Sequence, residues 1–236
     1  MLGLLGGSGL YDSSFIKVTE EKSIRTPYGE TSDTFQIGRV GDLTVVFLLR
    51  HGRRHTIPPH LVNHKANLWA LKKIGVMHLI STSSSGSLKK EIKPGQFVVP
   101  DDFICFWDIP TTIVNVHHPT PELDSELRKV LVNAVTKSGT KVRKTGTYVQ
   151  TLGPRLETKA EIRFFKSIGH ILGMTMATEV SIANELGIAY ASLCSVDNYC
   201  NGIVPEPLKY DKIVEHQKKN ASKLQDSVKA ALEMLS

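Results

Sequence analysis

Short apolar runs, several of them rich in β-branched residues, alternate along the chain with segments in which apolar positions recur every three or four residues. The short runs predict buried strands at residues 2–5, 44–49, 77–81, 97–99, 147–151 and 188–196. The helical spacing predicts helices at residues 61–74, 125–137, 159–167, 179–186 and 211–235. This alternation indicates an α/β fold with a largely parallel or mixed sheet, in which chemistry gathers at the carboxyl ends of the strands.

The final helix has the clearest pattern. Its apolar positions follow one another at helical spacings and form one buried stripe, made of Ala221, Leu224, Val228, Ala231, Leu232 and Leu235. No internal repeat, low-complexity stretch or linker rich in Pro, Gly or Ser divides the chain. We therefore expect residues 1–236 to form a single domain.

Composition narrows the class of protein. The chain is 41% hydrophobic and 22% charged, which is typical of globular proteins. No apolar run approaches the ~18 residues of a membrane span. The Gly-broken N-terminus has no basic region of the kind that begins a signal peptide, so we expect a cytoplasmic protein with no membrane partner. Cys105, Cys194 and Cys200 lack CxxC spacing and predict neither disulfides nor a metal site.

The net charge of +6 changes this picture only slightly. Lysines and arginines are scattered among acidic residues, and no basic stripe is interleaved with aromatic residues. This pattern is typical of a solvated surface rather than of a nucleic-acid interface. A basic chain also suits a small anionic substrate such as phosphate.

Three of the predicted strands end in residues that suit an anion. The first ends in Gly6-Gly7-Ser8-Gly9, where glycines let backbone amides approach a ligand and Ser8 adds a hydroxyl. The second ends in RHGRRH, residues 50–55, which begins with a potential bidentate donor, Arg50. The third ends in STSSSGS, residues 81–87. Each also reads as an ordinary turn or solvated loop, but together they predict one phosphate site.

A fourth strand end, GPRLE, covers residues 153–157, and Thr175 lies just before a predicted helix. The Thr175 hydroxyl could join the phosphate donors, and Glu179 reads as an acid at the start of that helix.

Six ordered motifs together resemble the trimeric purine nucleoside phosphorylase family, in its methylthioadenosine phosphorylase branch. They are GLLGGSGLYD, TPYGETSD, LLRHGRRHTIPPHLVNHKANLWALKKIGV, STSSSGSL, TLGPRLETKAE and MTMATEVSIANELGIAYASL. The similarity runs from the first strand to the final helix, with a shorter region near residues 106–118. The resemblance implies a mixed, partly barrel-like sheet flanked by helices, and a homotrimer or a dimer of trimers. It also implies reversible phosphorolysis of a purine nucleoside, with inorganic phosphate as co-substrate and no metal or organic cofactor.

The resemblance assigns roles to individual residues. His55 would lie near phosphate and sugar and take part in catalysis, and Met174 would pack against the ribose. Leu156 stands where the family usually has a Phe against the base. The residues that would bind phosphate are Ser8, Arg50, His51, Ser83, Ser84 and Thr175.

Three departures from the methylthioadenosine phosphorylases concern the base. Those enzymes read adenine with two Asp residues, whose positions hold Asn198 and Cys200 here, and Glu157 replaces their Ser. An ionised Glu accepts from N1–H of a 6-oxopurine, while an Asn amide donates to O6 and accepts from N7–H. We therefore expect Glu157 and Asn198 to be catalytic residues that read a 6-oxopurine. The alternative is a helix-start acid at position 157 and a turn residue at position 198.

Two alternatives remain for the group on the sugar's 5′ carbon, a methylthio group and a hydroxyl. Tyr210, Ile213 and Val214 match positions that form an apolar 5′ pocket in the methylthio enzymes, which favours 5′-methylthioinosine. The Tyr210 hydroxyl equally suits the 5′-hydroxyl of inosine or guanosine. His117 or His118 could also reach this pocket from a neighbouring subunit, although a surface or core position accounts for either.

The sequence thus predicts phosphorolysis of 6-oxopurine nucleosides, namely S-methyl-5′-thioinosine and inosine or guanosine. One alternative is an adenine-releasing 5′-methylthioadenosine phosphorylase, against which the two missing Asp residues argue. Another is a non-catalytic nucleoside-binding protein on the same fold, which would not need a phosphate site. A dinucleotide-dependent dehydrogenase lacks the third glycine of its fingerprint here.

Overall fold

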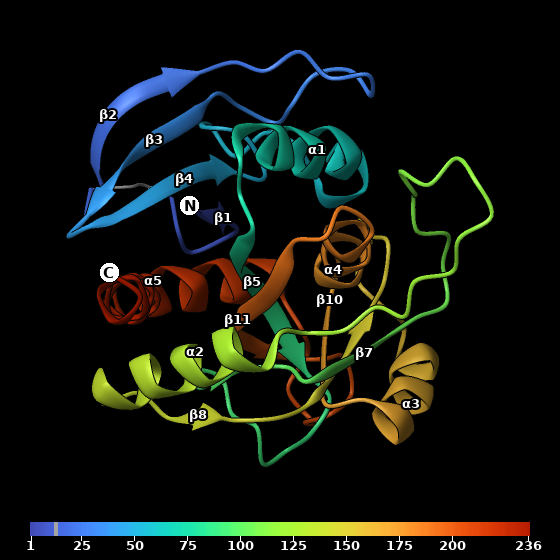
Figure 1. Ribbon diagram of the computed structural model, residues 1–236. Coiled ribbons are helices and arrows are strands. Elements are labelled where there is room, and N and C mark those ends of the chain that lie inside the picture. The colour runs from blue at the N-terminus through green and yellow to red at the C-terminus, as the bar shows by residue number, and fades with distance from the viewer. Residues whose placement is uncertain (12–13) are drawn as a thin grey trace.

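Strand β5 (His78–Ser87) joins two parts of one large mixed sheet in the computed structural model, which describes residues 1–11 and 14–236 (Figure 1). β1 (Leu2–Gly6) and β11 (Ala189–Tyr199) both run parallel to it. Beyond the end of β1, the short strand β10 (Ile171–Gly173) pairs antiparallel with Gly86 and Ser87. The sheet therefore branches at the second half of β5, and β1 ends beside this branch.

Further strands extend the sheet on both sides of the branch. On one side β4 (Leu43–Leu49) runs parallel to β1, and an antiparallel pair follows, β3 (Phe35–Val40) and β2 (Lys17–Lys22). On the other side β10 pairs in parallel with β9 (Thr147–Gln150), and β9 pairs with β7 (Asp102–Cys105). The two-residue strands β6 (Phe97–Val98) and β8 (Val142–Arg143) continue from β11.

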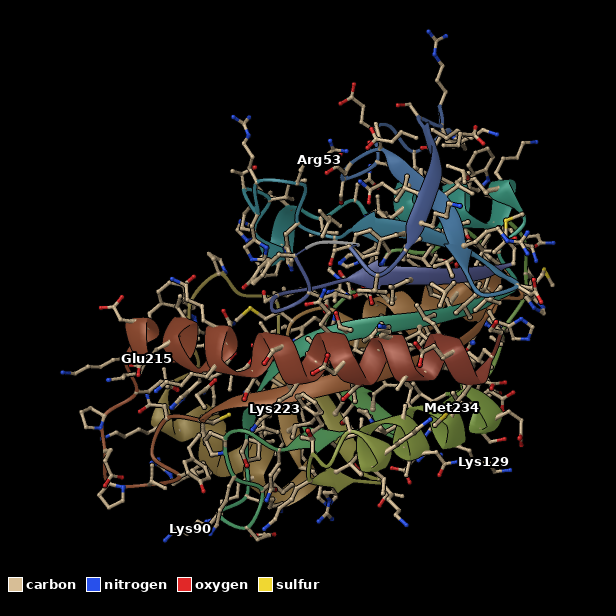
Figure 2. All side chains as sticks on the ribbon, turned by 90° about the vertical axis from the view of Figure 1, so that its left-hand side faces the viewer. Arg53, Lys90, Lys129, Glu215, Lys223 and Met234 are labelled. Carbon is tan, nitrogen blue, oxygen red and sulfur yellow. The ribbon has the colours of Figure 1, made fainter. Side chains whose placement is uncertain are left out.

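Helices cover both faces of the sheet and bury two separate hydrophobic clusters. α1 (His64–Ile74) and α4 (Met176–Glu185) pack on one face with Leu68 and Val180 in its core. α2 (Ser125–Lys137) and α5 (Tyr210–Met234) lie side by side on the other face (Figure 1). Figure 2 shows α5 crossing this face, with Glu215 near its start and Met234 at its end. α3 (Lys159–Ile168) packs through Ile162 and Phe165 in a third, smaller cluster.

The predicted α/β architecture is confirmed, with corrections at element boundaries. α2 has the predicted bounds, α3 ends one residue later than predicted, and α5 begins and ends one residue earlier than predicted. α1 begins three residues late, because Asn63 caps it and a short 3-10 turn, η1 (Pro59–Leu61), precedes it. α4 begins three residues before the predicted start, with Thr175 as its N-cap.

The prediction that β5 ends at residue 81 is wrong. Its serine run continues as strand to Ser87, because β11 pairs with β5 along its whole length and supplies hydrogen-bond partners throughout. Strands β2, β3, β7, β8 and β10 were not predicted. β2 is exposed at every position, and β7, β8 and β10 are too short to show a period.

No helix among residues 1–11 and 14–236 has the length and apolar character needed to cross a bilayer.

Candidate active site

A cavity of about 440 Å³ opens above the branch of the sheet. Residues from the ends of β1 and β4, from the second half of β5 and from the start of α5 line it together. With the exception of Val214, all of the predicted site residues line this cavity: Ser8, Arg50, His51, His55, Ser83, Ser84, Leu156, Glu157, Met174, Thr175, Asn198, Cys200, Tyr210 and Ile213.

The placement of Val214 in the site is not supported. Ile213 is buried and lines the cavity, whereas Val214 is half-buried and lies outside the lining. One step along a helix turns a side chain by about 100°, which directs Val214 away from the side on which Ile213 lines the cavity. His117 and His118 are exposed and also lie outside the lining.

Arg50 is the buried cation of the cavity, with 1% of its surface exposed. Its Nε and Nη2 donate to the two carboxylate oxygens of Glu179, the Nη2–Oε2 distance being 2.9 Å. Its Nη1 donates to the carbonyl oxygen of Thr82 at 2.9 Å. Three of its five N–H groups are therefore engaged by the protein, and two remain for an anion in the cavity.

Glu179 is more than an acid at the start of a helix. Its side chain is fully buried, and it also accepts a hydrogen bond of 2.8 Å from the Tyr190 hydroxyl. Burial alone would raise the pKa of Glu179, but the charge and hydrogen bonds of Arg50 outweigh it and hold that pKa below its usual value. The carboxylate thus stays ionised and fixes the direction in which the Arg50 guanidinium points.

Two neutral histidines lie beside Arg50. Burial, reinforced by the charge of Arg50, lowers the pKa of His51 to about 4 and also lowers the pKa of His55. The neutral His51 ring donates from Nδ1 to the Ile57 carbonyl oxygen at 2.8 Å, so its Nε2 is left as an acceptor. A phosphate carrying a proton could donate to it. Arg50 therefore supplies the positive charge of this part of the cavity.

His55 adopts a left-handed backbone conformation with φ of 53°, which is unusual for a residue other than glycine. Its Nε2 lies 3.3 Å from the Ser8 hydroxyl oxygen, and its ring contacts those of His51 and Tyr11. Strained backbone of this kind persists where the surrounding structure holds it, and it is frequent at functional sites. The turn after β4 thus brings His55 next to Ser8, which lies in the glycine-rich turn after β1.

Glu157 turns its carboxylate toward the cavity and does not cap the following helix. The start of α3 is capped by Thr158, and Glu161 completes the capping box. The Thr151 hydroxyl donates to Glu157 Oε1 at 2.7 Å, which leaves Oε2 for a ligand. Burial raises the pKa of Glu157, and the Thr151 hydrogen bond opposes that rise.

Asn198 belongs to β11 and not to a turn. It pairs with Gly86 of β5 just after a bulge in β11, and bulges redirect the side chains that follow them. Its Nδ2 donates to the Tyr199 carbonyl oxygen at 3.0 Å, which fixes the amide orientation and leaves Oδ1 as an acceptor. A side chain at Gly86 would come within 2.6 Å of Cys200 Sγ and 3.0 Å of Asn198 Nδ2, so this site requires glycine.

Comparison with known proteins identifies the family. Residues 2–233 match the sequence model of the Phosphorylase superfamily. The chain belongs to this superfamily. A probable 6-oxopurine nucleoside phosphorylase of Archaeoglobus fulgidus is 43% identical over 224 residues, which cover 94% of this chain and 91% of the relative. A probable S-methyl-5′-thioinosine phosphorylase of Thermodesulfovibrio yellowstonii is 40% identical over 223 residues, 91% of this chain and 83% of the relative.

Solved structures agree with this assignment. The methylthioadenosine phosphorylase of Schistosoma mansoni, solved in complex with adenine, matches with a TM-score of 0.92 and 30% identity, over 99% of this chain and 91% of that one. The resemblance drawn from the six motifs is thereby confirmed, as is the nucleoside phosphorylase fold.

Four residues that the sequence did not assign to the site line or support the cavity of this superfamily member. Gly86 and Gln217 line its wall, and Thr151 and Glu179, outside the lining, hold predicted site residues. Gln217 could have been found from the sequence. It lies four residues before Ala221 and so falls on the buried stripe of the last helix, where a polar residue is unexpected. Within residues 1–11 and 14–236, no group of three or more His, Cys, Asp or Glu side chains could hold a metal ion.

Proposed function

We propose that this chain catalyses the reversible phosphorolysis of 6-oxopurine nucleosides to a free purine and a ribose 1-phosphate. The substrates would be inosine, guanosine and S-methyl-5′-thioinosine. The observation that carries this proposal is that one cavity holds an acceptor carboxylate, Glu157, and a fixed amide, Asn198, together with the cationic Arg50. The names of the relatives from Archaeoglobus and Thermodesulfovibrio support the same substrates.

The phosphate would be both nucleophile and electrostatic partner. When the C1′–N9 bond breaks, positive charge develops on the sugar, and the bonding electrons leave with the purine. A phosphate oxygen then forms the new bond to C1′. The protein needs to hold the anion in line and to stabilise charge, for which the two free N–H groups of Arg50 and the hydroxyls of Ser8 and Thr175 are suited.

The purine would be read along its 6-oxo edge. Asn198 has one N–H engaged by Tyr199, and its second N–H can donate to O6 while Oδ1 accepts from a protonated N7. Ionised Glu157 can accept from N1–H through Oε2. Protonation at N7 makes the purine a better leaving group, so the hydrogen bonds that identify the base also assist its departure.

One observation favours a second candidate, adenine release from 5′-methylthioadenosine. Adenine N1 carries a lone pair that would face the Glu157 carboxylate unfavourably, but a protonated Glu157 could donate to it. Because burial raises the pKa of Glu157, this state becomes populated as the solution is acidified. The structure of the Schistosoma relative with adenine shows that a similar fold accepts that base.

The proposal includes an assembly and a setting. We expect a homotrimer or a dimer of trimers that recovers purine bases in the cytoplasm and needs no cofactor besides phosphate. Exposed apolar side chains, among them Phe106, Trp107, Phe164 and Leu152, offer surface for self-association. Light scattering should give the mass of three or six chains, and a chelator should leave the rate unchanged.

The proposed activity is tested by replacing the carboxylate that reads N1–H. Glu157→Gln should lower kcat/KM for inosine by about 10² or more, because a buried hydrogen bond to the base is lost and a mismatched amide takes its place. Glu161→Gln is the matched control, since it makes the same change nearby, outside the cavity, with a residue that still suits the capping box. Equal activity of both variants would remove Glu157 from the base site.

A further inference from the structure

Glu157, which the proposed reaction uses to read the purine, lies on a loop between β9 and α3. A side chain on a loop is a precise acceptor only where other parts of the protein hold it in place. One such contact comes from Asn201, whose Nδ2 donates to the Glu157 backbone carbonyl oxygen at 3.2 Å. This contact fixes the main chain of the loop, but it leaves the direction of the carboxylate open.

Thr151 holds the carboxylate itself. Its hydroxyl donates to Glu157 Oε1 at 2.7 Å, a distance typical of a hydrogen bond to an ionised oxygen. Both residues are buried, with 5% of Thr151 and 6% of Glu157 exposed. A hydrogen bond in such surroundings is stronger than one in water, so it can fix the rotation of the carboxylate.

The sheet in turn fixes the Thr151 hydroxyl. Thr151 directly follows β9, and its N–H donates to the carbonyl oxygen of Gly173 in β10 at 2.9 Å. This bond continues the parallel ladder in which Gln150 pairs with Gly173. A β-branched side chain also has few rotamers, so the position of the hydroxyl follows closely from that of the strand. The end of β9 therefore imposes the geometry of the sheet on a loop carboxylate.

Thr151 lies outside the cavity lining, whereas Glu157 belongs to it. The Thr151 hydroxyl can therefore act on a bound purine only through Glu157. Other titratable groups act on Glu157 more weakly. Burial is the main cause that raises the pKa of Glu157, the Thr151 hydrogen bond is the largest cause that opposes it, and the charges of Glu161 and Arg155 follow with opposite signs. Burial and the Glu157 charge raise the pKa of the Cys200 thiol well above its usual value, so Cys200 stays neutral.

We propose that Thr151 is a positioning residue of the base site, whose hydroxyl holds the Glu157 carboxylate with Oε2 free to meet N1–H and thereby selects 6-oxopurines against 6-aminopurines. The inference rests on the proposed phosphorolysis and names a residue that determines its base selectivity. A hydrogen bond donated to a carboxylate favours the ionised form, which can only accept. A 6-aminopurine has a lone pair at N1, so a carboxylate held in this state and direction would repel it.

The test removes the hydroxyl and then restores it. Thr151→Val keeps the branched shape without the hydroxyl, and it should lower kcat/KM for inosine about ten- to a hundredfold while KM for phosphate stays unchanged. Thr151→Ser keeps the hydroxyl and should retain most of the activity. Thr147→Val, the same change on β9 and outside the cavity, is the matched control and should behave as the unaltered enzyme does.

A pH profile separates positioning from a purely structural role. The measured quantity is kcat/KM for inosine divided by kcat/KM for adenosine, which should fall on acidification as Glu157 becomes protonated. In Thr151→Val this fall should occur about one pH unit higher, because the hydrogen bond no longer opposes the effect of burial on the pKa of Glu157. Thr151→Ser should return the profile to its original position. A purely structural defect would slow both substrates equally and leave the profile in place.

The outcomes separate this inference from the proposed function. If Thr151→Val does not fold, Thr151→Ala is measured in the same way. An unshifted profile, or a Thr151→Ser variant as impaired as Thr151→Val, would overturn the positioning role, while hypoxanthine release by the unaltered enzyme would leave the proposed function intact. If the unaltered chain releases no base from any nucleoside in the presence of phosphate, the proposed function fails and this inference falls with it.

Discussion

Glu179 binds two nitrogens of Arg50 inside a region that is closed to solvent, although 129 residues separate the two in the chain. The pair links the fold to the proposed phosphate site. One guanidinium neutralises a buried carboxylate and still has N–H groups for an anion in the cavity.

Glu179→Gln should therefore impair both stability and phosphate use. The change leaves the Arg50 charge buried without its partner, which should lower the free energy of unfolding by about 3–5 kcal/mol. It should also raise KM for phosphate, because the guanidinium loses its fixed direction. Urea unfolding and initial rates at varied phosphate would measure both effects. Glu215→Gln, which breaks an exposed contact to Lys212 and Lys219, should change neither quantity appreciably.

Acid should destabilise the protein through its buried histidines. Burial is the main cause that lowers the pKa values of both His51 and His64 from 6.5 to about 4. Between about pH 4 and pH 6.5 both histidines bind a proton in the unfolded chain but stay neutral in the folded protein. The contribution to stability is complete above pH 6.5 and falls by about 1.4 kcal/mol per histidine for each pH unit down to about pH 4.

The variant His64→Gln isolates one of these groups. Because it removes one titration, the gap in unfolding free energy between the unaltered protein and the variant should narrow as the pH falls from 6.5 to about 4. Urea titrations at several pH values would give this gap directly. A gap that is independent of pH would show that His64 is not held neutral by burial.

Base selectivity should depend on pH through Glu157. Burial raises its pKa above 4.5, and only the ionised form accepts from N1–H of a 6-oxopurine. As the pH falls, hypoxanthine release should decline relative to any adenine release, because the protonated form suits adenine instead. The measurement is the kcat/KM for inosine divided by the kcat/KM for adenosine, from neutral pH to about pH 5. Titrations that affect both reactions equally cancel in this ratio. Glu157→Gln should make the ratio flat, and a pH-dependent ratio in that variant would assign the effect to another group.

Neighbouring residues at the start of α5 should differ in their effect on the substrate. Ile213→Ala enlarges the cavity and should raise KM for nucleosides several-fold, because the substrate loses apolar contact area. Val214→Ala should leave KM nearly unchanged, since Val214 lies outside the lining. Similar KM values for the two variants would contradict this placement of the helix face.

The proposed phosphate side of the cavity could largely be assembled from the sequence. Ser8 follows β1, Arg50 and His51 follow β4, and Thr175 precedes α4. Because strand ends and helix starts can be recognised from apolar periodicity and glycine, and because such ends meet at one edge of a sheet, these residues could be placed together.

The interactions that hold these residues were not predictable. Glu179 has the local pattern of a helix-start acid, and only the tertiary fold shows that it faces Arg50. Asn198 follows a bulge in β11, which has no periodic signal. Gln217 reaches the cavity wall only because the tertiary fold brings the start of α5 beside β5. Val214 lies outside the cavity lining, because apolar periodicity gave the range of the last helix to within one residue at each end but not the direction of its cavity face.

The central claim is that the cavity reads a 6-oxopurine during phosphorolysis. The most direct test is to supply inosine, guanosine, methylthioinosine, adenosine and methylthioadenosine together, with and without inorganic phosphate, and to quantify the released bases. We predict phosphate-dependent release of hypoxanthine and guanine, with little adenine. Adenine as the main product would contradict the roles of Glu157 and Asn198, and base release that does not require phosphate would contradict phosphorolysis itself.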